Sequence, residues 1–406
     1  MRSTILLNRQ HVVAPVLGLP EGAGASVFGA ARMRGPIARD AIARVTALSP
    51  ATVNRQVTAL LDAGLLRERP DLAATGAIGR PRVPVEVNDQ PYLTLGLHIG
   101  ARTTSIVASD LFGRTLDAVE MPTPQTGQAA ALSALAASSR RYLSRWHRRR
   151  PLWVGVAIGG IVDSASGTVD HPRLGWSEAP VGAVLAEALG LPASVAVHVD
   201  AMAGAELLLG MRRFSAASST SLYVYARETV GYALVIGGRV HSPASGPGTI
   251  AGLAVQSTLL GGSGRLESTV SDEAVVAGAR RMRIVPDDSA TTTMVVRAAR
   301  EGSAPARELL AERARVLGSA IALLRDVLNP DDLVVGGQAF TDYPEGMADL
   351  EAAYTESATL PPRDIRLTAF GNRVQEVGAG VVSLGGLYAD PIGAMRRASR
   401  RPGIPA

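Results

Sequence analysis

Apolar positions divide this chain into a short helical part and a longer part with a different period. Between residues 26 and 64, apolar side chains recur every three or four positions, which is typical of helices that bury one face. From about residue 92, short continuous apolar runs are bounded by glycine turns, which is typical of buried strands. Helical periods return between several of these runs. We therefore expect a small helical domain followed by a large α/β body.

The body contains a weak internal repeat. YLTLGLHIGARTTSIV at 92–107 predicts strand, glycine turn and strand, and SLYVYARETVGYALVIGG at 221–238 repeats that order. Such a repeat favours two similar lobes with a ligand cleft between them. The closing helix of the second lobe is free to pack back on the first. The expected limits are a flexible tail at 1–24, the small domain at 25–90, a first lobe at 91–215, a second lobe at 216–395 and a tail at 396–406.

The most informative local stretch is LSPATVNRQVTALLDAGLL at 48–66. Ser49 is a good N-cap, Pro50 a good first helical residue and Gly64 a typical helix end. The helix between them carries one apolar stripe, formed by Val53, Val57, Leu60 and Leu61. The preceding segment predicts a second helix whose apolar positions are Ile37, Ala41, Val45 and Leu48. Two helices joined by a tight turn predict a helix-turn-helix.

The opposite face of the second helix has the composition of a DNA-reading surface. Its first turns present small or polar side chains and one arginine, which suits the major groove of double-stranded DNA. The segment 65–88 then predicts strand, loop and strand, a wing whose arginine-bearing tip could enter a minor groove. The predicted DNA-contacting residues are Ala51, Thr52, Asn54, Arg55, Thr58, Arg80 and Arg82.

The distribution of charge supports this interpretation. Residues 31–82 hold nine arginines and four acids, so this segment accounts for the whole net charge of +5. A basic segment beside a neutral remainder is typical of a polyanion-binding module. An ordinary helical hairpin with solvated arginines is the alternative, but cap, stripe, polar face and wing together favour double-stranded DNA as partner. A second arginine run, RRYLSRWHRRR at 140–150, is expected to be a solvated helix end.

Composition excludes several classes of protein and several kinds of site. The chain has no cysteine, which excludes disulfides, thiolate nucleophiles and cysteine-ligated zinc. It has no run of about 18 uncharged apolar residues, so we expect no membrane span. The apolar patch near the N-terminus is interrupted by Arg9, Gln10 and His11 and lacks a cleavage site. A cytoplasmic protein is therefore expected.

From about residue 25 to 392 the chain resembles the ROK family of bacterial repressors and sugar kinases. The resemblance rests on the wing sequence TGAIGRPR, the two glycine-turn openings, GWSEAPV at 175–181, the strand-to-helix junction around Asp200, and NPDDLVVGG at 329–337. It implies an α/β body of two lobes with the actin-like, ribonuclease-H-like fold. It also implies that a winged helix-turn-helix DNA-binding domain precedes this body.

The phosphate loops implied by the resemblance are altered here. The family's first loop reads Asp-x-Gly-Gly-Thr, but this chain has HIGAR at 98–102, so His98 replaces the metal-side carboxylate. Imidazole is a poor Mg²⁺ ligand, and His98 is alternatively just a polar residue at a strand end. The second loop, Gly-Thr-Gly-Ile-Gly, corresponds to RETVG at 227–231, which has lost two of three glycines that allow close backbone approach.

The sugar-binding and zinc positions are altered as well. Asp200 matches the family's proton-abstracting aspartate, whereas Val199 replaces a sugar-binding asparagine. An N-cap role would also explain Asp200, and both interpretations stay open. The sugar-binding glutamate and histidine are missing from GTIAG at 248–252, and the zinc motif at 258–267 keeps Glu267 but none of its three cysteines.

These features favour a DNA-binding transcriptional regulator, a repressor rather than an enzyme, without cofactor or metal. Its body would form a homodimer or homotetramer and sense a sugar-like effector. The candidate effector residues are His98, Trp176, Asp200 and Glu267. Two alternatives remain open: a sugar kinase with an accessory DNA-binding domain, and a regulator whose body is a ligand-independent scaffold.

Overall fold

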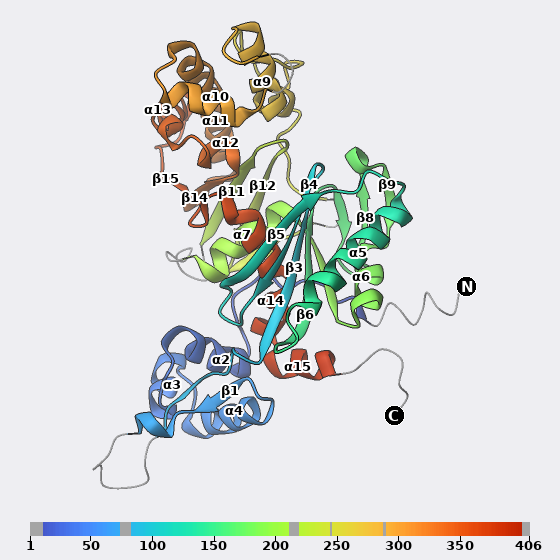
Figure 1. The fold of residues 1–406 in the computed structure, drawn as a ribbon. Helices are drawn as coiled ribbons and strands as arrows, with labels where there is room; N and C mark the ends of the chain where they lie inside the picture. Colours follow the sequence, from blue (N-terminus) through green and yellow to red (C-terminus); the bar gives the residue numbers. More distant parts are fainter. Residues whose placement is uncertain (1–10, 74–82, 211–218, 244–245, 287–289, 400–406) are drawn as a thin grey trace. The chain divides into compact units, whose positions relative to one another are not determined.

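The structure is a computed structural model that describes residues 11–73, 83–210, 219–243, 246–286 and 290–399 (Figure 1). The chain divides into two compact units. The first consists of residues 1–204 and 376–406, and the second of residues 205–375.

The N-terminal domain of the first unit is a winged helix-turn-helix. Strands β1 and β2 pair antiparallel, with Arg67 opposite Glu86. The structure confirms the predicted order of two helices and two paired strands, and also the helical pattern expected from about residue 26, which is α2. The described elements are α2 (Ala23–Arg34), α3 (Arg39–Thr46), α4 (Pro50–Asp62), β1 (Leu66–Glu68) and β2 (Val85–Val87).

The buried face of α3 differs from the predicted one. Ile37 lies ahead of the helix, where its backbone forms a β-bridge with Val85. The helix therefore starts at Arg39 and turns Ile42 into the core, while Val45 is 41% exposed. Helical spacing counted from Ile37 was misleading because that residue belongs to an extended segment.

The body of the first unit is built on a five-stranded sheet in the order β10-β6-β3-β4-β5. β4 pairs antiparallel with both β3 and β5, whereas β6 and β10 extend the sheet in parallel. A smaller sheet has the order β7-β8-β9. The elements are β3 (Tyr92–Ile99), β4 (Thr103–Ser109), β5 (Thr115–Pro122), α5 (Gln128–Ser144), β6 (Arg150–Ile158), β7 (Ile161–Asp163), β8 (Thr168–His171), β9 (Trp176–Ala179), α6 (Val181–Leu189), β10 (Ala193–Val197) and α7 (His198–Leu209).

The second unit repeats this sheet. Its order is β13-β12-β11-β14-β15, again with two antiparallel neighbours on one side and two parallel strands on the other. The predicted internal repeat and the two-lobed α/β fold are therefore confirmed. The elements are β11 (Thr220–Ala226), β12 (Val230–Ile236), β13 (Arg239–His241), α8 (Leu266–Val270), α9 (Asp272–Arg281), α10 (Thr292–Arg300), α11 (Ala304–Leu328), β14 (Asp332–Gly336), α12 (Gln338–Thr341), α13 (Met347–Ser357) and β15 (Ile365–Leu367).

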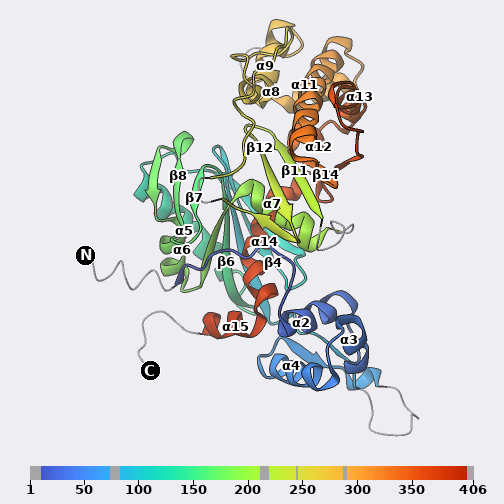
Figure 2. The ribbon, with the colours of Figure 1, turned by 180° about the vertical axis from the view of Figure 1, so that it is seen from behind.

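The closing helices α14 (Val374–Ala389) and α15 (Pro391–Ser399) belong almost entirely to the first unit (Figure 2). A Cβ at Gly96 of β3 would lie 2.7 Å from the backbone of α14, and one at Gly155 of β6 would lie 2.2 Å from it. This backbone-to-backbone packing holds α14 against the sheet. The compact units consequently divide at 204/205 and 375/376, whereas we expected one lobe boundary at 215/216.

Residues 11–22 also differ from the expected flexible tail at 1–24. Val13 donates a backbone hydrogen bond to the carbonyl of Ala193 (2.9 Å). Val12 and Leu17 are buried, and Leu17 lies against Gly204 of α7. This stretch packs against the rest of the first unit as an extended chain, and its buried residues are scattered along it. It therefore shows no regular hydrophobic period.

Candidate functional site

Helix α4 is positioned by its cap and its apolar stripe. Ser49 Oγ accepts a hydrogen bond from the backbone N–H of Thr52 (3.2 Å) and lies 2.9 Å from Thr52 Oγ1. Val53, Val57 and Leu60 are fully buried. A cap of this kind stabilises the first turn by about 1 kcal/mol. The start and inward face of the helix are therefore as predicted.

The predicted DNA-contacting residues of α4 share the opposite face. Ala51, Asn54, Arg55 and Thr58 are exposed. Thr52 is half-buried, and its hydroxyl is engaged with Ser49, so it is better placed to support the cap than to read a base. Arg80 and Arg82, at the predicted wing tip, lie outside the described residues.

Arg39 is a residue of this surface that sequence reasoning missed. Its guanidinium donates to Asn54 Oδ1 (3.5 Å) and lies 3.3 Å from a carboxylate oxygen of Glu68 in β1. It thereby connects the first residue of α3 with α4 and with the wing. The arginine count of this domain gave no sign of the contact, because Arg39 and Asn54 are far apart in sequence.

Several arginines behind the predicted charge excess are paired with acids. Arg67 and Arg69 both bind Glu86 (2.7 and 2.9 Å), and Arg69 also binds Asp71 (2.6 Å). Arg44 pairs with Asp40 (3.0 Å). Among the described residues of this domain, Arg34 and Arg55 are exposed and have no acid within salt-bridge distance. The free positive charge is therefore more localised than the composition suggests.

Three of the six histidines gather at one end of the large sheet in the first unit. His98 lies near the end of β3, His171 ends β8 and His198 begins α7. The rings of His98 and His198 are parallel within 2°, with centroids 6.0 Å apart. A Cβ placed on Gly159 would meet both His171 and His198 within 3.9 Å. Residues distant in sequence thus form one histidine cluster.

Burial favours the neutral form of two of these histidines. Burial, together with the smaller effect of the neighbouring His171, lowers the pKa of His198 to about 4. Burial also lowers the pKa of His171, whose Nδ1 accepts the backbone N–H of Leu174 (3.3 Å). Neutral imidazoles at His171 and His198 can both donate and accept hydrogen bonds, which suits an uncharged polar ligand.

Two other candidate effector residues lie near this cluster. Trp176 pairs with His171 across β8 and β9 and is buried, and its indole N–H has no hydrogen-bond partner among the described residues. Asp200 is buried within the first turn of α7, two residues after His198. Asp200 is therefore not the N-cap residue, because the helix begins at His198. Its carboxylate lies where the helix dipole favours negative charge.

Glu267 belongs to the second unit, in the first turn of α8. Its Oε2 accepts the backbone N–H of Val230 (3.0 Å), which is part of the loop 227–231. In the same loop, the N–H of Arg227 donates to the carbonyl of Thr229 (3.1 Å). In the first unit, the N–H of Gly100 donates to the carbonyl of Thr103 (3.0 Å) and closes the β3–β4 hairpin. These backbone donors are already used within the protein.

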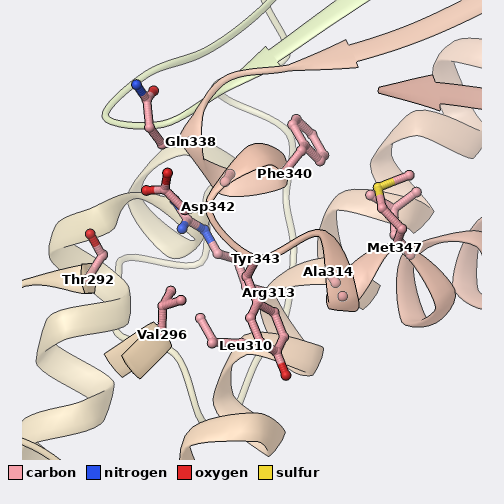
Figure 3. A pocket seen from close by; sticks show the side chains of 13 residues that line it. Thr292, Val296, Leu310, Arg313, Ala314, Gln338, Phe340, Asp342, Tyr343 and Met347 are labelled. Carbon is pink, nitrogen blue, oxygen red and sulfur yellow. The ribbon is translucent and has the colours of Figure 1, made fainter. Parts of the chain in front are cut away.

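A pocket in the second unit was not predicted (Figure 3). It lies among α10, α11, α12 and α13, and the space between their atoms, much of it open to solvent, amounts to about 440 Å³. Its lining is mostly apolar, with polar groups from Thr292, Gln338, Asp342 and Arg313. Gln338 Oε1 is buried there without a hydrogen-bond partner among the described residues. Nothing in the local sequence marks this pocket, because helices from separate segments create it.

No group of three or more histidines and acids within the described ranges has a geometry that could hold a metal ion. None of the helices in the described part of the chain is long and apolar enough to cross a membrane.

Comparison with known proteins identifies the family to which this chain belongs. The profile of the ROK family matches residues 94–379. The chain belongs to the ROK family. It is 69% identical to Transcriptional regulator Rv0485 of Mycobacterium tuberculosis over 401 residues, which cover 97% of this chain and 92% of that protein. It is 25% identical to the N-acetylglucosamine repressor of Escherichia coli O157:H7 over 328 residues, 77% of this chain and 80% of that one.

Solved structures of the ROK family share the fold. A ROK family transcriptional regulator, a homologue of the E. coli MLC protein, matches with a TM-score of 0.76 at 22% identity, covering 92% of this chain and 97% of that one. A ROK family glucokinase from Streptomyces griseus matches 72% of this chain and 99% of its own, with a TM-score of 0.61 at 21% identity. The predicted family and fold are therefore confirmed, including the actin-like body shared with sugar kinases.

Proposed function

We propose that this chain is a transcriptional regulator that binds double-stranded DNA through α4 and the wing and represses transcription there. The observation that carries the proposal is the capped helix α4, which buries one apolar face and exposes Ala51, Asn54, Arg55 and Thr58 on the other. That face suits base edges in the major groove. The names of the relatives at 69% and 25% identity agree with it.

The body of this regulator has a non-catalytic role in the proposal. The carboxylate expected on the metal side of a kinase phosphate loop is replaced by His98. The backbone donors at Gly100, Arg227 and Val230 are occupied within the protein. Losing several ligand contacts at about 1–3 kcal/mol each would abolish ordinary affinity for ATP and hexose. The survival of Asp200 and Glu267 is the remaining support for kinase activity.

The body instead pairs two copies and senses a small polar effector. A helix-turn-helix reads two half-sites when its protein is a dimer, so we propose a homodimer or a dimer of dimers. The histidine cluster with Trp176 and Asp200 suits an uncharged polar molecule such as a sugar. The E. coli relative is named for N-acetylglucosamine, which supports the choice of sugars as the first compounds to test.

Selection of genomic DNA fragments by the purified full-length chain tests the DNA-binding role. We expect fragments with two related half-sites, with an affinity that falls as salt rises. If the protein shows no salt-dependent binding to any fragment, the DNA-binding role is refuted.

A coupled ADP-release assay across hexoses and amino sugars tests the kinase alternative. Turnover that is abolished by Asp200→Asn would show that the protein is a kinase and would contradict our proposal. Thermal-shift screening with sugars separates an effector-sensing body from a scaffold, because only the former gains stability from a ligand.

A further inference from the structure

Arginine side chains gather on the surface of the first unit beside the DNA-binding domain. Arg148 lies in the turn before β6, Arg150 is the first residue of that strand, and Arg396 and Arg397 lie in the last turns of α15. We name these four residues the basic ridge. All four are exposed. Arg150 donates to the carbonyl of Ala398 (3.0 Å) and to Ser399 Oγ (3.1 Å), which joins the two segments.

The basic ridge adjoins the C-terminal end of α4. The neighbouring Arg149 donates to the backbone carbonyls of Tyr92 (3.0 Å) and Asp89 (3.3 Å), just after the wing. The hydroxyl of Tyr92 lies against Gly64, where α4 ends: a Cβ on that glycine would be 2.6 Å from it. Helix α15 also contacts both α2 and α4, as Figures 1 and 2 show from opposite sides.

Few acids neutralise this surface. Arg397 is 3.7 Å from Asp390, in a pair whose side chains are about half exposed (47% and 57%), so it contributes little. Arg148 and Arg396 have no acid within salt-bridge distance among the described residues. The net charge of the chain outside residues 31–82 is zero, but its charges are not evenly distributed. Locally, it carries positive charge where the DNA-binding domain meets the body.

We propose that the basic ridge is a second DNA-binding surface, which binds the phosphate backbone flanking the segment that α4 reads. A duplex bound by α4 extends beyond the base pairs that this helix contacts, and the ridge adjoins the C-terminal end of the helix. Guanidinium groups bind phosphate oxygens in bidentate geometry. Phosphate contacts add affinity without reading bases. The inference rests on the proposed DNA-binding function and extends the footprint of that function.

The test uses the full-length chain and a genomic fragment selected by the wild-type protein. Binding is measured over a salt series to a minimal duplex that holds only the half-sites and to one extended by roughly one helical turn at each end. The variant Arg148→Gln/Arg396→Gln removes two charges whose side chains are exposed. The matched control, Arg280→Gln/Arg363→Gln, removes two exposed charges from the second unit. Unchanged thermal unfolding verifies that each variant folds.

We expect the ridge variant to bind the extended duplex about three- to tenfold more weakly than the wild type at 0.1 M salt, while its affinity for the minimal duplex is unchanged. The slope of log K against log salt on the extended duplex should fall by about 2 for each bound protomer, because each protomer loses two phosphate contacts. Three results would refute DNA binding by the ridge while leaving the proposed function intact. These are an equal loss of affinity for both duplexes, no loss of affinity, or the same loss in the control variant. A wild-type protein that selects no DNA would overturn both.

Discussion

The guanidinium of Arg32, in α2, lies 4.1 Å from the centre of the Tyr388 ring, in α14. Tyr388 is only 2% exposed, and its hydroxyl donates to the carbonyl of Leu111 (3.0 Å). The ring of Phe28, also in α2, has its centre 6.4 Å from that of the Tyr388 ring. Because α14 is packed against the large sheet, this arrangement connects the DNA-binding domain with the body through a buried side chain. A shift of α14 would therefore reach α2 directly.

Replacing Tyr388 should loosen this connection. We expect Tyr388→Leu to lower the free energy of unfolding by about 2–4 kcal/mol, because it removes the ring beneath Arg32 and leaves a cavity. Tyr388→Phe keeps the ring and should cost only about 1 kcal/mol, the hydrogen bond to Leu111. Chemical denaturation measures both, and limited proteolysis between α2 and the body reports the loosening. Equal losses in the two variants would assign the effect to the hydroxyl and contradict the role of the ring.

Arg55 should determine base preference rather than general affinity. If it binds guanine in bidentate geometry, Arg55→Ala should weaken specific binding by about 1–3 kcal/mol and relax the preference at one position of each half-site. Selection from a randomised operator measures this preference. Arg34→Ala is the matched control, since Arg34 is also exposed without an acid nearby but lies outside α4. An unchanged base preference in Arg55→Ala would show that Arg55 contacts phosphate only.

The histidine cluster should make stability depend on pH. Burial lowers the pKa of His198 to about 4 in the folded chain, against about 6.5 when unfolded. Between these values the unfolded chain binds more protons, so stability rises with pH. The contribution, about 2–3 kcal/mol, is present above pH 6.5 and lost as the pH falls towards 4. The lowered pKa of His171 acts in the same direction.

Unfolding free energies measured from pH 4 to 7.5 test this pH dependence. His198→Gln should flatten the curve across that range, while His147→Gln, at an exposed position on the arginine-rich turn, should leave it unchanged. A wild-type curve that falls as pH rises through this window would contradict the assignment.

In the second unit, Asp272 and Arg313 form a buried ion pair of 2.8 Å, with side-chain exposures of 14% and 6%. Arg313 also donates to the carbonyl of Val270 (2.7 Å). Asp272→Ala should destabilise this unit by about 3 kcal/mol, because it leaves a buried guanidinium without its counter-charge. Glu301→Ala, in an exposed pair with Arg297, should change stability by less than about 0.5 kcal/mol. Thermal unfolding compares the two, and similar losses would mean that Asp272 is solvated.

Local chemistry was enough to predict several elements of this protein, whereas its family was predicted from the resemblance of its motifs. Ser49, Pro50 and the stripe Val53, Val57 and Leu60 specify α4, because capping and apolar spacing act within a few residues. The two glycine-turn openings predict the repeated sheets for the same reason. The start of an element was predicted less well than its type. Ile37 fits the helical period of α3, but it lies ahead of that helix and takes part in a β-bridge.

Contacts between distant segments were decided only by the tertiary structure. Topology brings His98, His171 and His198 to one end of a sheet, and burial there lowers the pKa values of His171 and His198. Arg39 meets Asn54, Arg150 meets the end of α15, and Tyr388 meets Arg32, although no local pattern links these pairs. The physical reason is the distance along the chain over which each effect acts. Periodicity and capping depend on residues close together in sequence, and they indicate where an element starts and which of its faces is apolar. The neighbours of each polar or charged group depend instead on how the whole chain packs.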